Sequence, residues 1–253
     1  MSPKLHTQRQ VESIINEFAS FNMGWFFGLF PFSIDVVLKL YHCSETRSMR
    51  SLWLLNELDI PFELVDMPFD LKIMRSAEYL SVHPLGRVPC LVDGAFRLFE
   101  SGAIAEYLCE RYPLAGLGRL AGDSERYEWL QWIHYSETMA VHAAALVQQR
   151  YFIAPPDRSA VIAKLEGRRL EKAVQVVETQ LTDRDYLLRT GFSAADIGVG
   201  YSLHLASRLI ALAGFVGVSR YLERLRARPA FQASLPEGST GPIAWLPDSA
   251  SLP

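Results

Sequence analysis

The sequence has few of the residues that mark several classes of protein. Its 253 residues include only three cysteines, Cys43, Cys90 and Cys109, and this odd number without paired spacing argues against a disulfide framework or a zinc site. The formal net charge is −3 at pH 7, which gives no global electrostatic signal for nucleic acid. The sequence also has no internal repeat and no low-complexity segment. We therefore expect a reduced, cytoplasmic compartment, no metal and no nucleic-acid partner.

Long apolar runs are also missing, except for one near the N-terminus. Residues 21–38 are strongly apolar, but Pro31 and Asp35 interrupt them, whereas a transmembrane helix needs about 20 apolar residues. A signal peptide needs a basic start and a small-residue cleavage site, and neither is present in good form. We expect residues 1–36 to be an extension that packs on the domain or stays loose. The alternatives are an overcalled start site, with the compact domain beginning near Val37, and a membrane-surface role. No membrane partner is expected.

The part of the chain after this extension alternates between short apolar runs and helical patterns. The patterns predict, in order, a strand, a helix, a strand, an irregular helical segment, two strands and a helix at residues 36–41, 48–58, 62–67, 70–82, 90–92, 96–98 and 101–112. Asp93-Gly94 is a hairpin turn signal between the last two strands. Because parallel strands need a crossover and hairpins are antiparallel, this order predicts a small mixed sheet with helices on its faces.

The rest of the chain is predicted to be helical after a glycine-rich linker at 114–122. The predicted helices span residues 123–150, 157–181, 193–212 and 219–228. Pro155-Pro156 ends the first of them, and Asp157 is the expected N-cap of the second. Ser193-Ala194-Ala195-Asp196 forms a capping box with aspartate in place of glutamate, so Ser193 and Asp196 are assigned a structural role.

Four local motifs occur in a fixed order along these elements. They are Val88-Pro89 before a strand, Glu100-Ser101-Gly102-Ala103-Ile104 at a helix start, Ser193-Ala194-Ala195-Asp196-Ile197, and Tyr221-Leu222 with Arg228-Pro229-Ala230-Phe231. Together they resemble the cytosolic glutathione transferase family, as a bacterial-type member, over residues 37–232. The resemblance implies a two-domain fold: a thioredoxin-like βαβ-α-ββα domain at 37–116 and an all-α domain at 117–253, which includes a C-terminal tail.

The resemblance also implies a site for glutathione as co-substrate. A cis Pro89 leaves the Val88 backbone facing outward, where the extended tripeptide can pair as an added strand. Ser101 is expected to cap its helix and, with the backbone N–H groups of the helix N-terminus, to take the γ-glutamyl carboxylate. Glu100 is expected to pair with the α-amino group, and Arg87 with the glycyl carboxylate.

The group that activates the thiol is less well defined by the sequence. Thr46 falls where many members of the family carry serine, and its hydroxyl would stabilise the thiolate by a hydrogen bond. Threonine in place of serine is a departure from that pattern. It has the same hydroxyl, but its methyl group restricts the rotamer and crowds the sulfur. Ser44 and Ser48 are the nearby alternatives. Cys43 could form mixed disulfides with glutathione, although a buried, inert thiol fits its position better.

The second substrate is expected to bind between the two domains, facing the sulfur. The residues assigned to its wall come from the first long helix of the second domain: Trp132, Tyr135, Ser136, Met139 and His142. The competing interpretation of the same residues is ordinary interdomain core or dimer contact.

The resemblance therefore predicts a detoxifying glutathione transferase that adds the thiolate to a small electrophile. One alternative is a glutathione-dependent disulfide reductase or isomerase that uses the same site. The other is a non-catalytic relative that binds a protein partner. A homodimer with C2 symmetry is expected, with Phe96 and Arg97 as candidate rim residues.

Overall fold

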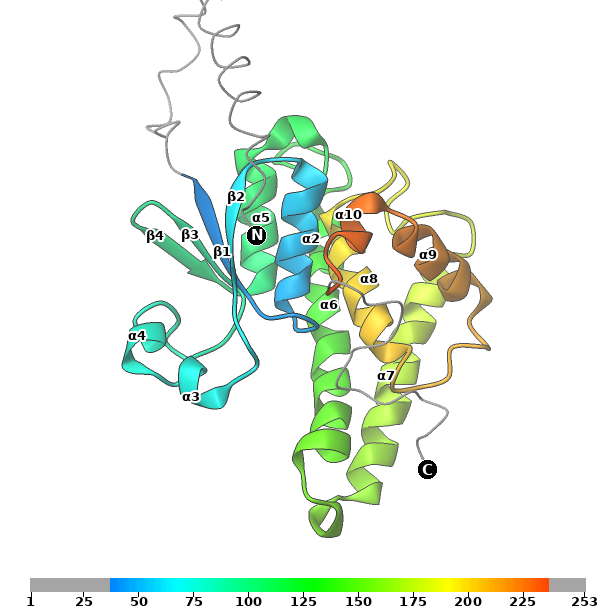
Figure 1. Cartoon of the computed structure of the whole chain (residues 1–253). Coiled ribbons are helices and arrows are strands. Elements are labelled where there is room, and N and C mark those ends of the chain that lie inside the picture. The colour runs from blue at the N-terminus through cyan, green and yellow to red at the C-terminus, as the bar shows by residue number, and fades with distance from the viewer. Residues whose placement is uncertain (1–36, 237–253) are drawn as a thin grey trace, which may run out of the picture. The chain divides into compact units, whose positions relative to one another are not determined.

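The computed structural model of the chain describes residues 37–236 (Figure 1). The extension predicted at residues 1–36 and the chain from residue 237 onward lie outside the described residues. Within residues 37–236, no helix is long and apolar enough to cross a membrane.

The first half of the described chain is built on a four-stranded mixed sheet (Figure 1). Its strands run in the order β2-β1-β3-β4, and their bounds are Leu38–His42 for β1, Phe62–Asp66 for β2, Cys90–Asp93 for β3 and Phe96–Phe99 for β4. β1 pairs with β2 in parallel, and β3 is antiparallel to both β1 and β4. The parallel pair is connected through α2, Ser48–Leu58, as the crossover rule requires. The predicted order of elements is confirmed.

The helices of this half lie against the sheet and at one end of it. α2 and α5, Ser101–Arg111, pack side by side and contact the strands, whereas the short helices α3, Leu71–Met74, and α4, Ala77–Leu80, follow β2 (Figure 1). Nine of the eleven residues of α2 are buried, because one face meets the sheet and another meets the helical half. Trp53 on α2 is fully buried and packs edge-on against Phe231, with their ring centroids 4.9 Å apart.

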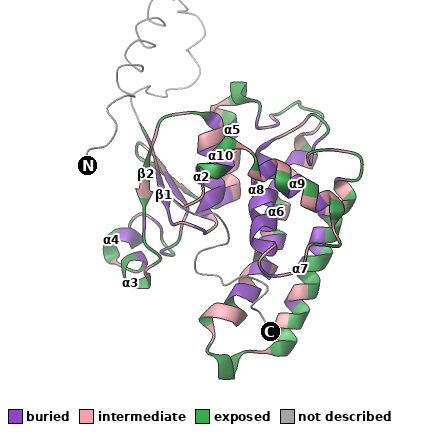
Figure 2. Ribbon diagram, turned by 45° about the vertical axis from the view of Figure 1, so that its right-hand side comes forward, coloured by how far each residue is buried: buried purple, intermediate pink, exposed green. Residues whose placement is uncertain are grey.

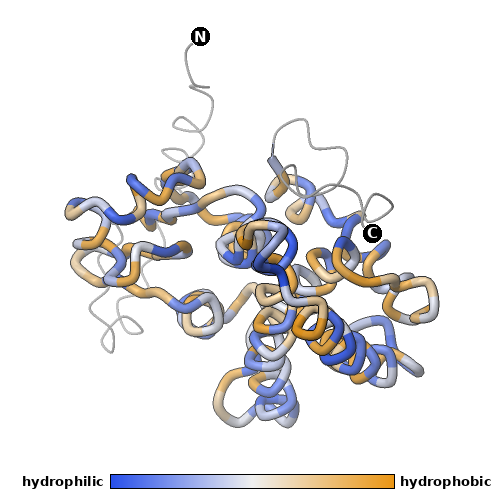
Figure 3. Tube along the Cα trace, turned by 90° about the horizontal axis from the view of Figure 1, so that it is seen from below, coloured by the Kyte–Doolittle hydropathy of each residue, from blue (hydrophilic) through white to orange (hydrophobic). Residues whose placement is uncertain are grey.

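The second half is helical. Its main helices are α6, Arg126–Val147, α7, Ala160–Gln180, α8, Ala194–Ala206, α9, Val216–Arg226, and the short α10, Pro229–Gln232. All thirteen residues of α8 are buried, so this helix forms the centre of the half (Figure 2). The outer helix α7 is amphipathic, and hydrophilic and hydrophobic stretches alternate along the helices in Figure 3. The architecture is that of a thioredoxin-like domain followed by a helical domain.

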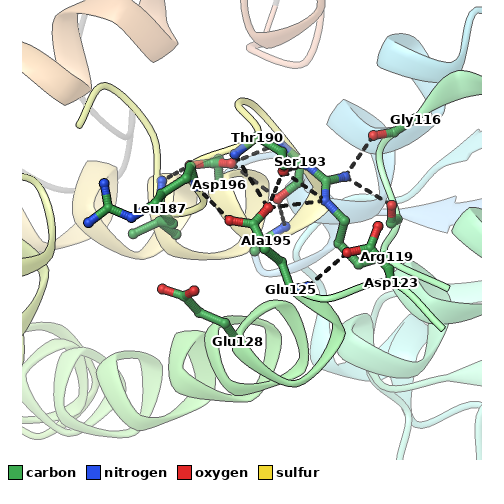
Figure 4. Close-up of polar contacts among 12 residues, drawn as sticks. Gly116, Arg119, Asp123, Glu125, Glu128, Leu187, Thr190, Ser193, Ala195 and Asp196 are labelled. Atoms are coloured by element: carbon green, nitrogen blue, oxygen red, sulfur yellow. Dashed lines mark hydrogen bonds and ion pairs between the residues drawn. The ribbon is translucent and has the colours of Figure 1, made fainter. Parts of the chain in front are cut away.

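A polar cluster fixes the start of α8 (Figure 4). The Ser193 hydroxyl accepts from the Ala195 N–H, and Asp196 Oδ2 accepts from the Ser193 N–H at 2.8 Å, so the capping box is present. Asp196 Oδ1 also accepts from the Leu187 N–H at 2.9 Å and from the Tyr221 hydroxyl at 2.8 Å. Because Asp196 is fully buried, each of these bonds replaces water that its carboxylate has lost.

Several helix boundaries differ from the predictions: both ends of α6 and the start of α9 lie three residues from their predicted places. Asp157 does not cap α7: it ends a 3₁₀ turn at 155–157, and Ser159 caps the helix by accepting from the Ile162 N–H at 3.2 Å. Consecutive prolines at the start of that turn fix it as a separate element before the helix begins. α8 ends at Ala206 instead of residue 212, where the Ser207 hydroxyl bonds back to the His204 carbonyl.

Candidate functional site

A polar pocket lies where the sheet half meets α6. Three segments of the sheet half contribute to it: the turn before α2, the loop between α4 and β3, and the start of α5. The residues that line it are Arg47, His83, Arg87, Val88, Pro89, Glu100, Ser101 and Glu137. All five residues that the sequence assigns to glutathione therefore lie on one pocket, together with three that it does not assign.

The loop before β3 presents free backbone groups to the pocket. The Val88–Pro89 peptide bond is cis, and the Val88 N–H and C=O have no hydrogen-bond partner among the described residues. The preceding Arg87 carbonyl, by contrast, is held by the Tyr79 hydroxyl at 2.7 Å. An extended peptide can use one free donor and one free acceptor at this point as strand partners.

The start of α5 differs in one respect from the prediction. Ser101 does not cap α5, because its hydroxyl accepts from Arg50 Nη1 at 3.0 Å and faces Glu137 Oε1 at 3.4 Å. The N-cap position is held by Glu100, whose φ is 75° and whose side chain is exposed and makes no cap hydrogen bond. The first N–H groups of the helix stay available to an anion.

Arg50 on α2 is the central connection between the two halves. Its side chain is only 4% exposed. Besides Ser101, it donates through Nη2 to the Ser136 carbonyl at 3.1 Å and to Ser202 Oγ at 2.8 Å, and through Nη1 to Glu137. A single guanidinium therefore joins α2, α5, α6 and α8.

Glu137 on α6 places a negative charge between two arginines. It accepts from Arg47 Nη1 at 3.1 Å in addition to Arg50. Burial by itself raises the pKa of this carboxyl, but the guanidiniums of Arg50 and Arg47 outweigh it and hold the pKa below its usual range. Glu137 is therefore charged at neutral pH and orients Arg47 toward the pocket.

The three hydroxyls predicted to activate the thiol are placed differently from one another. Ser48 is fully buried, which makes it the least accessible of the three hydroxyls. Thr46 and Ser44 are half-buried in the turn beside Arg47. Cys43 is 3% exposed, and burial raises the pKa of its thiol to about 11, so it stays a thiol at neutral pH.

Comparison with known proteins identifies the family. The chain is 30% identical over 207 residues to "Glutathione S-transferase 3" of Zea mays, covering 78% of this chain and 93% of that protein. The chain belongs to the glutathione S-transferase family. Residues 36–110 match the family model "Glutathione S-transferase, N-terminal domain". "Glutathione S-transferase F10" of Arabidopsis thaliana is 31% identical over 169 residues, covering 64% of this chain and 77% of the relative.

A solved glutathione transferase from Burkholderia graminis, with two glutathione molecules bound per subunit, has the same fold. It is 26% identical to this chain with a TM-score of 0.72, covering 81% of this chain and 90% of that one.

The predicted wall for the second substrate of the glutathione transferase is not formed as expected. Trp132 and Met139 lie in the core, the Tyr135 hydroxyl donates to the Ala173 carbonyl of α7 at 3.0 Å, and His142 Nδ1 lies 2.7 Å from Glu166 of α7. Two of the four residues, Tyr135 and His142, thus contact α7, and the other two are core residues. Of the wall residues considered, only Ser136 reaches the Arg50 contact region. The pocket receives the next residue, Glu137, instead.

Two lining residues of the pocket, Glu137 and His83, were missed. Glu137 has no local motif, because its partner Arg50 is 87 residues away in the sequence. His83 is 4% exposed, and its ring lies 4.9 Å from that of Phe99. Its position beside Arg87 in the loop before β3 is the signal that could have identified it. Within residues 37–236, no cluster of histidine, cysteine and acidic side chains could hold a metal ion.

Proposed function

We propose that this protein is a glutathione transferase that adds the glutathione thiolate to a small electrophile. The observation that carries the proposal is that Arg87, Val88, Pro89, Glu100 and Ser101 line one pocket at the domain boundary. The relatives named as glutathione S-transferases and the glutathione-bound structure from Burkholderia graminis support the same co-substrate. No observation on the described residues favours disulfide exchange or a non-catalytic role.

The pocket offers a complementary group for each part of the tripeptide. The free N–H and C=O of Val88 suit the cysteinyl backbone. Glu100 suits the α-amino group, and the Ser101 hydroxyl with the first N–H groups of α5 suits the γ-glutamyl carboxylate. Arg87 is exposed at the rim and suits the glycyl carboxylate.

The sulfur is expected beside the turn that precedes α2. Two groups of this turn favour a thiolate: the Thr46 hydroxyl and the Arg47 guanidinium. The Arg47 side chain is 43% exposed. The protein would supply position and thiolate stabilisation and would form no covalent bond to the substrate. Thr46 is the assigned hydroxyl, with Ser44 as the remaining alternative.

Three further features belong to the same proposal. A homodimer is supported by Phe96 on the edge strand β4, which is 49% exposed. A cytoplasmic location is supported by the three cysteines, which are free and buried. The bacterial type is supported by the structure from Burkholderia graminis, whereas both curated relatives named above are plant proteins.

Calorimetric titration of the full chain with glutathione tests the proposed glutathione site. Glu100→Ala removes a hydrogen bond to a charged group and is expected to weaken binding by at least about 1.5 kcal/mol, or roughly tenfold in Kd. The control is Glu110→Ala, which makes the same change on an exposed residue at the other end of α5. Equal Kd values for Glu100→Ala and the unmodified chain would contradict the assignment. Conjugation of glutathione to an activated aryl halide tests the activity itself.

A further inference from the structure

The turn before α2 contains a chain of three hydrogen-bonded side chains that leads away from the proposed thiol site. Thr46 Oγ1 lies 2.8 Å from Ser48 Oγ, which in turn lies 2.8 Å from His42 Nδ1. Ser48 is fully buried and His42 is 3% exposed, while Thr46 is half-buried. The chain therefore runs from a buried imidazole to the one of its two hydroxyls that is partly exposed.

The neighbours of these hydroxyls limit where each proton can point. Ser48 Oγ accepts from the Cys43 N–H at 3.1 Å and can donate its single proton to His42, to Thr46 or to the Cys43 carbonyl at 3.1 Å. Thr46 Oγ1 accepts from the Ser48 N–H at 3.3 Å and donates to the same Cys43 carbonyl at 2.8 Å. The Cys43 carbonyl also accepts from the Thr46 N–H at 3.3 Å. Because a carbonyl oxygen has two lone pairs, the two hydroxyls compete for the one that remains.

The position of the proton on His42 decides this competition. When Nδ1 is unprotonated, it accepts a hydrogen bond from the Ser48 hydroxyl, and the Thr46 hydroxyl donates to the Cys43 carbonyl. When Nδ1 carries the proton, His42 donates to Ser48, and the proton of Ser48 turns to the Cys43 carbonyl. The Thr46 proton is then released, while every buried polar group keeps a partner.

We propose that His42 is a positioning residue, which acts through Ser48 to release the Thr46 hydroxyl for donation to the glutathione thiolate. The inference rests on the proposed function. A thiolate beside Thr46 favours the arrangement in which the Thr46 hydroxyl donates to it, so the relay and the thiolate stabilise each other. The relay reorients donors and transfers no proton to the ligand.

The surroundings of His42 keep it neutral at pH 7. Burial lowers the pKa of His42, and the carboxylate of Asp66, paired opposite it on β2, together with the Ser48 contact offsets part of that effect. A neutral imidazole can place its proton on either nitrogen, which is the property that the relay needs. The adjacent Cys43 thiol does not compete for this role, because its own pKa is raised.

The test is the pKa of the thiol of bound glutathione, measured by the ultraviolet absorbance of the thiolate against pH. His42→Leu leaves one lone pair of Ser48 Oγ open to the Thr46 proton, and Ser48→Ala leaves the Cys43 carbonyl to Thr46. Each variant is therefore expected to lower the thiolate fraction about threefold to tenfold at pH values below that pKa. Little change in the Kd for glutathione is expected, because neither residue lines the pocket. His42→Asn keeps a donor near the Nδ1 position and should stay closer to the unmodified protein. Thr46→Ala combined with His42→Leu should be no worse than Thr46→Ala alone.

The outcomes separate this inference from the proposed function. His204→Leu removes another buried histidine, on α8, and should leave the thiol pKa unchanged. If Ser48→Ala, the smallest change, and His42→Leu both keep the original thiol pKa, the relay is wrong while the transferase assignment stands. Additive effects in the double variant would also overturn it. An unmodified protein that binds no glutathione, or forms no thiolate, would overturn the proposed function and this inference with it.

Discussion

Replacing Glu137 with glutamine tests whether one carboxylate joins the two halves of the described chain. Glu137 accepts from Arg47 and from Arg50, and the Arg50 side chain is only 4% exposed. Glutamine keeps the size of the side chain but removes its charge. Arg50 would then remain buried with only neutral acceptors, on Ser101, Ser136 and Ser202.

The expected cost follows from the burial of the two partners. Removing one partner of a fully buried ion pair costs about 3–5 kcal/mol. The Glu137 side chain is 36% exposed, so solvent screens part of this interaction, and the amide oxygen of glutamine still accepts a hydrogen bond. We therefore expect the free energy of unfolding to fall by about 2 kcal/mol at pH 7.

The pH dependence of this loss has a definite sign. The pKa of Glu137 is depressed in the folded state, because its two arginines outweigh the effect of burial. Its contribution to stability is complete above the unfolded pKa and disappears as the pH falls through the folded pKa. The difference between the unmodified protein and Glu137→Gln should therefore shrink as the solution is acidified below about pH 4.3.

Urea denaturation across this pH range measures both quantities. The matched control is Glu63→Gln, which removes an exposed partner of Lys39 at 3.0 Å and should cost less than about 1 kcal/mol. The reasoning is refuted if Glu137→Gln costs no more than the control, or if its effect is the same at every pH.

Two further changes can be checked directly. Thr46→Ala should raise the pKa of the bound glutathione thiol by about one to two units, since a hydrogen bond to a charged group contributes about 1.5–3 kcal/mol; an unchanged thiolate absorbance would rule out Thr46. Gly86→Ala should cost more than about 2 kcal/mol in urea denaturation, because φ is +58° and the new Cβ would lie 2.1 Å from the Met74 carbonyl oxygen. Gly116→Ala, with φ of +68° and no neighbour within 4 Å, should cost only about 1 kcal/mol.

The fold could be predicted wherever the sequence carries helix-breaking or turn-forming residues. α2 begins at Ser48 and ends at Leu58 as predicted, shortly before Pro61, and Asp93-Gly94 lies at the turn between β3 and β4. The end of α8 was misplaced by six residues because apolar residues continue beyond Ala206 without a proline or a capping glycine nearby. There, tertiary packing decides the boundary instead of the local pattern.

In the candidate site, too, the residues in local motifs could be predicted, whereas those that depend on tertiary packing could not. Arg87, Val88 and Pro89 are consecutive and lie in the sequence before Glu100 and Ser101, so motif order was enough to bring them together. The face of α6 that meets them depends on the rotation of that helix, and periodicity alone did not determine it. Helical spacing grouped Tyr135, Met139 and His142 on one face, and two of them, Tyr135 and His142, hydrogen-bond to α7. A prediction of a shared face does not say which neighbour the face meets.

Ser101 does not cap α5 as expected, and this has a consequence for the proposed glutathione site. A capping serine would point its oxygen back at its own helix, and its proton would be set by local geometry. Here Arg50 donates to that oxygen from the side of α2, so the Ser101 proton points elsewhere, and Glu137 faces it at 3.4 Å. A γ-glutamyl carboxylate that takes this proton must displace Glu137, which stays held by its two arginines. If Ser101 binds glutathione as proposed, we expect binding of the ligand and contact between the halves to be coupled through this hydroxyl.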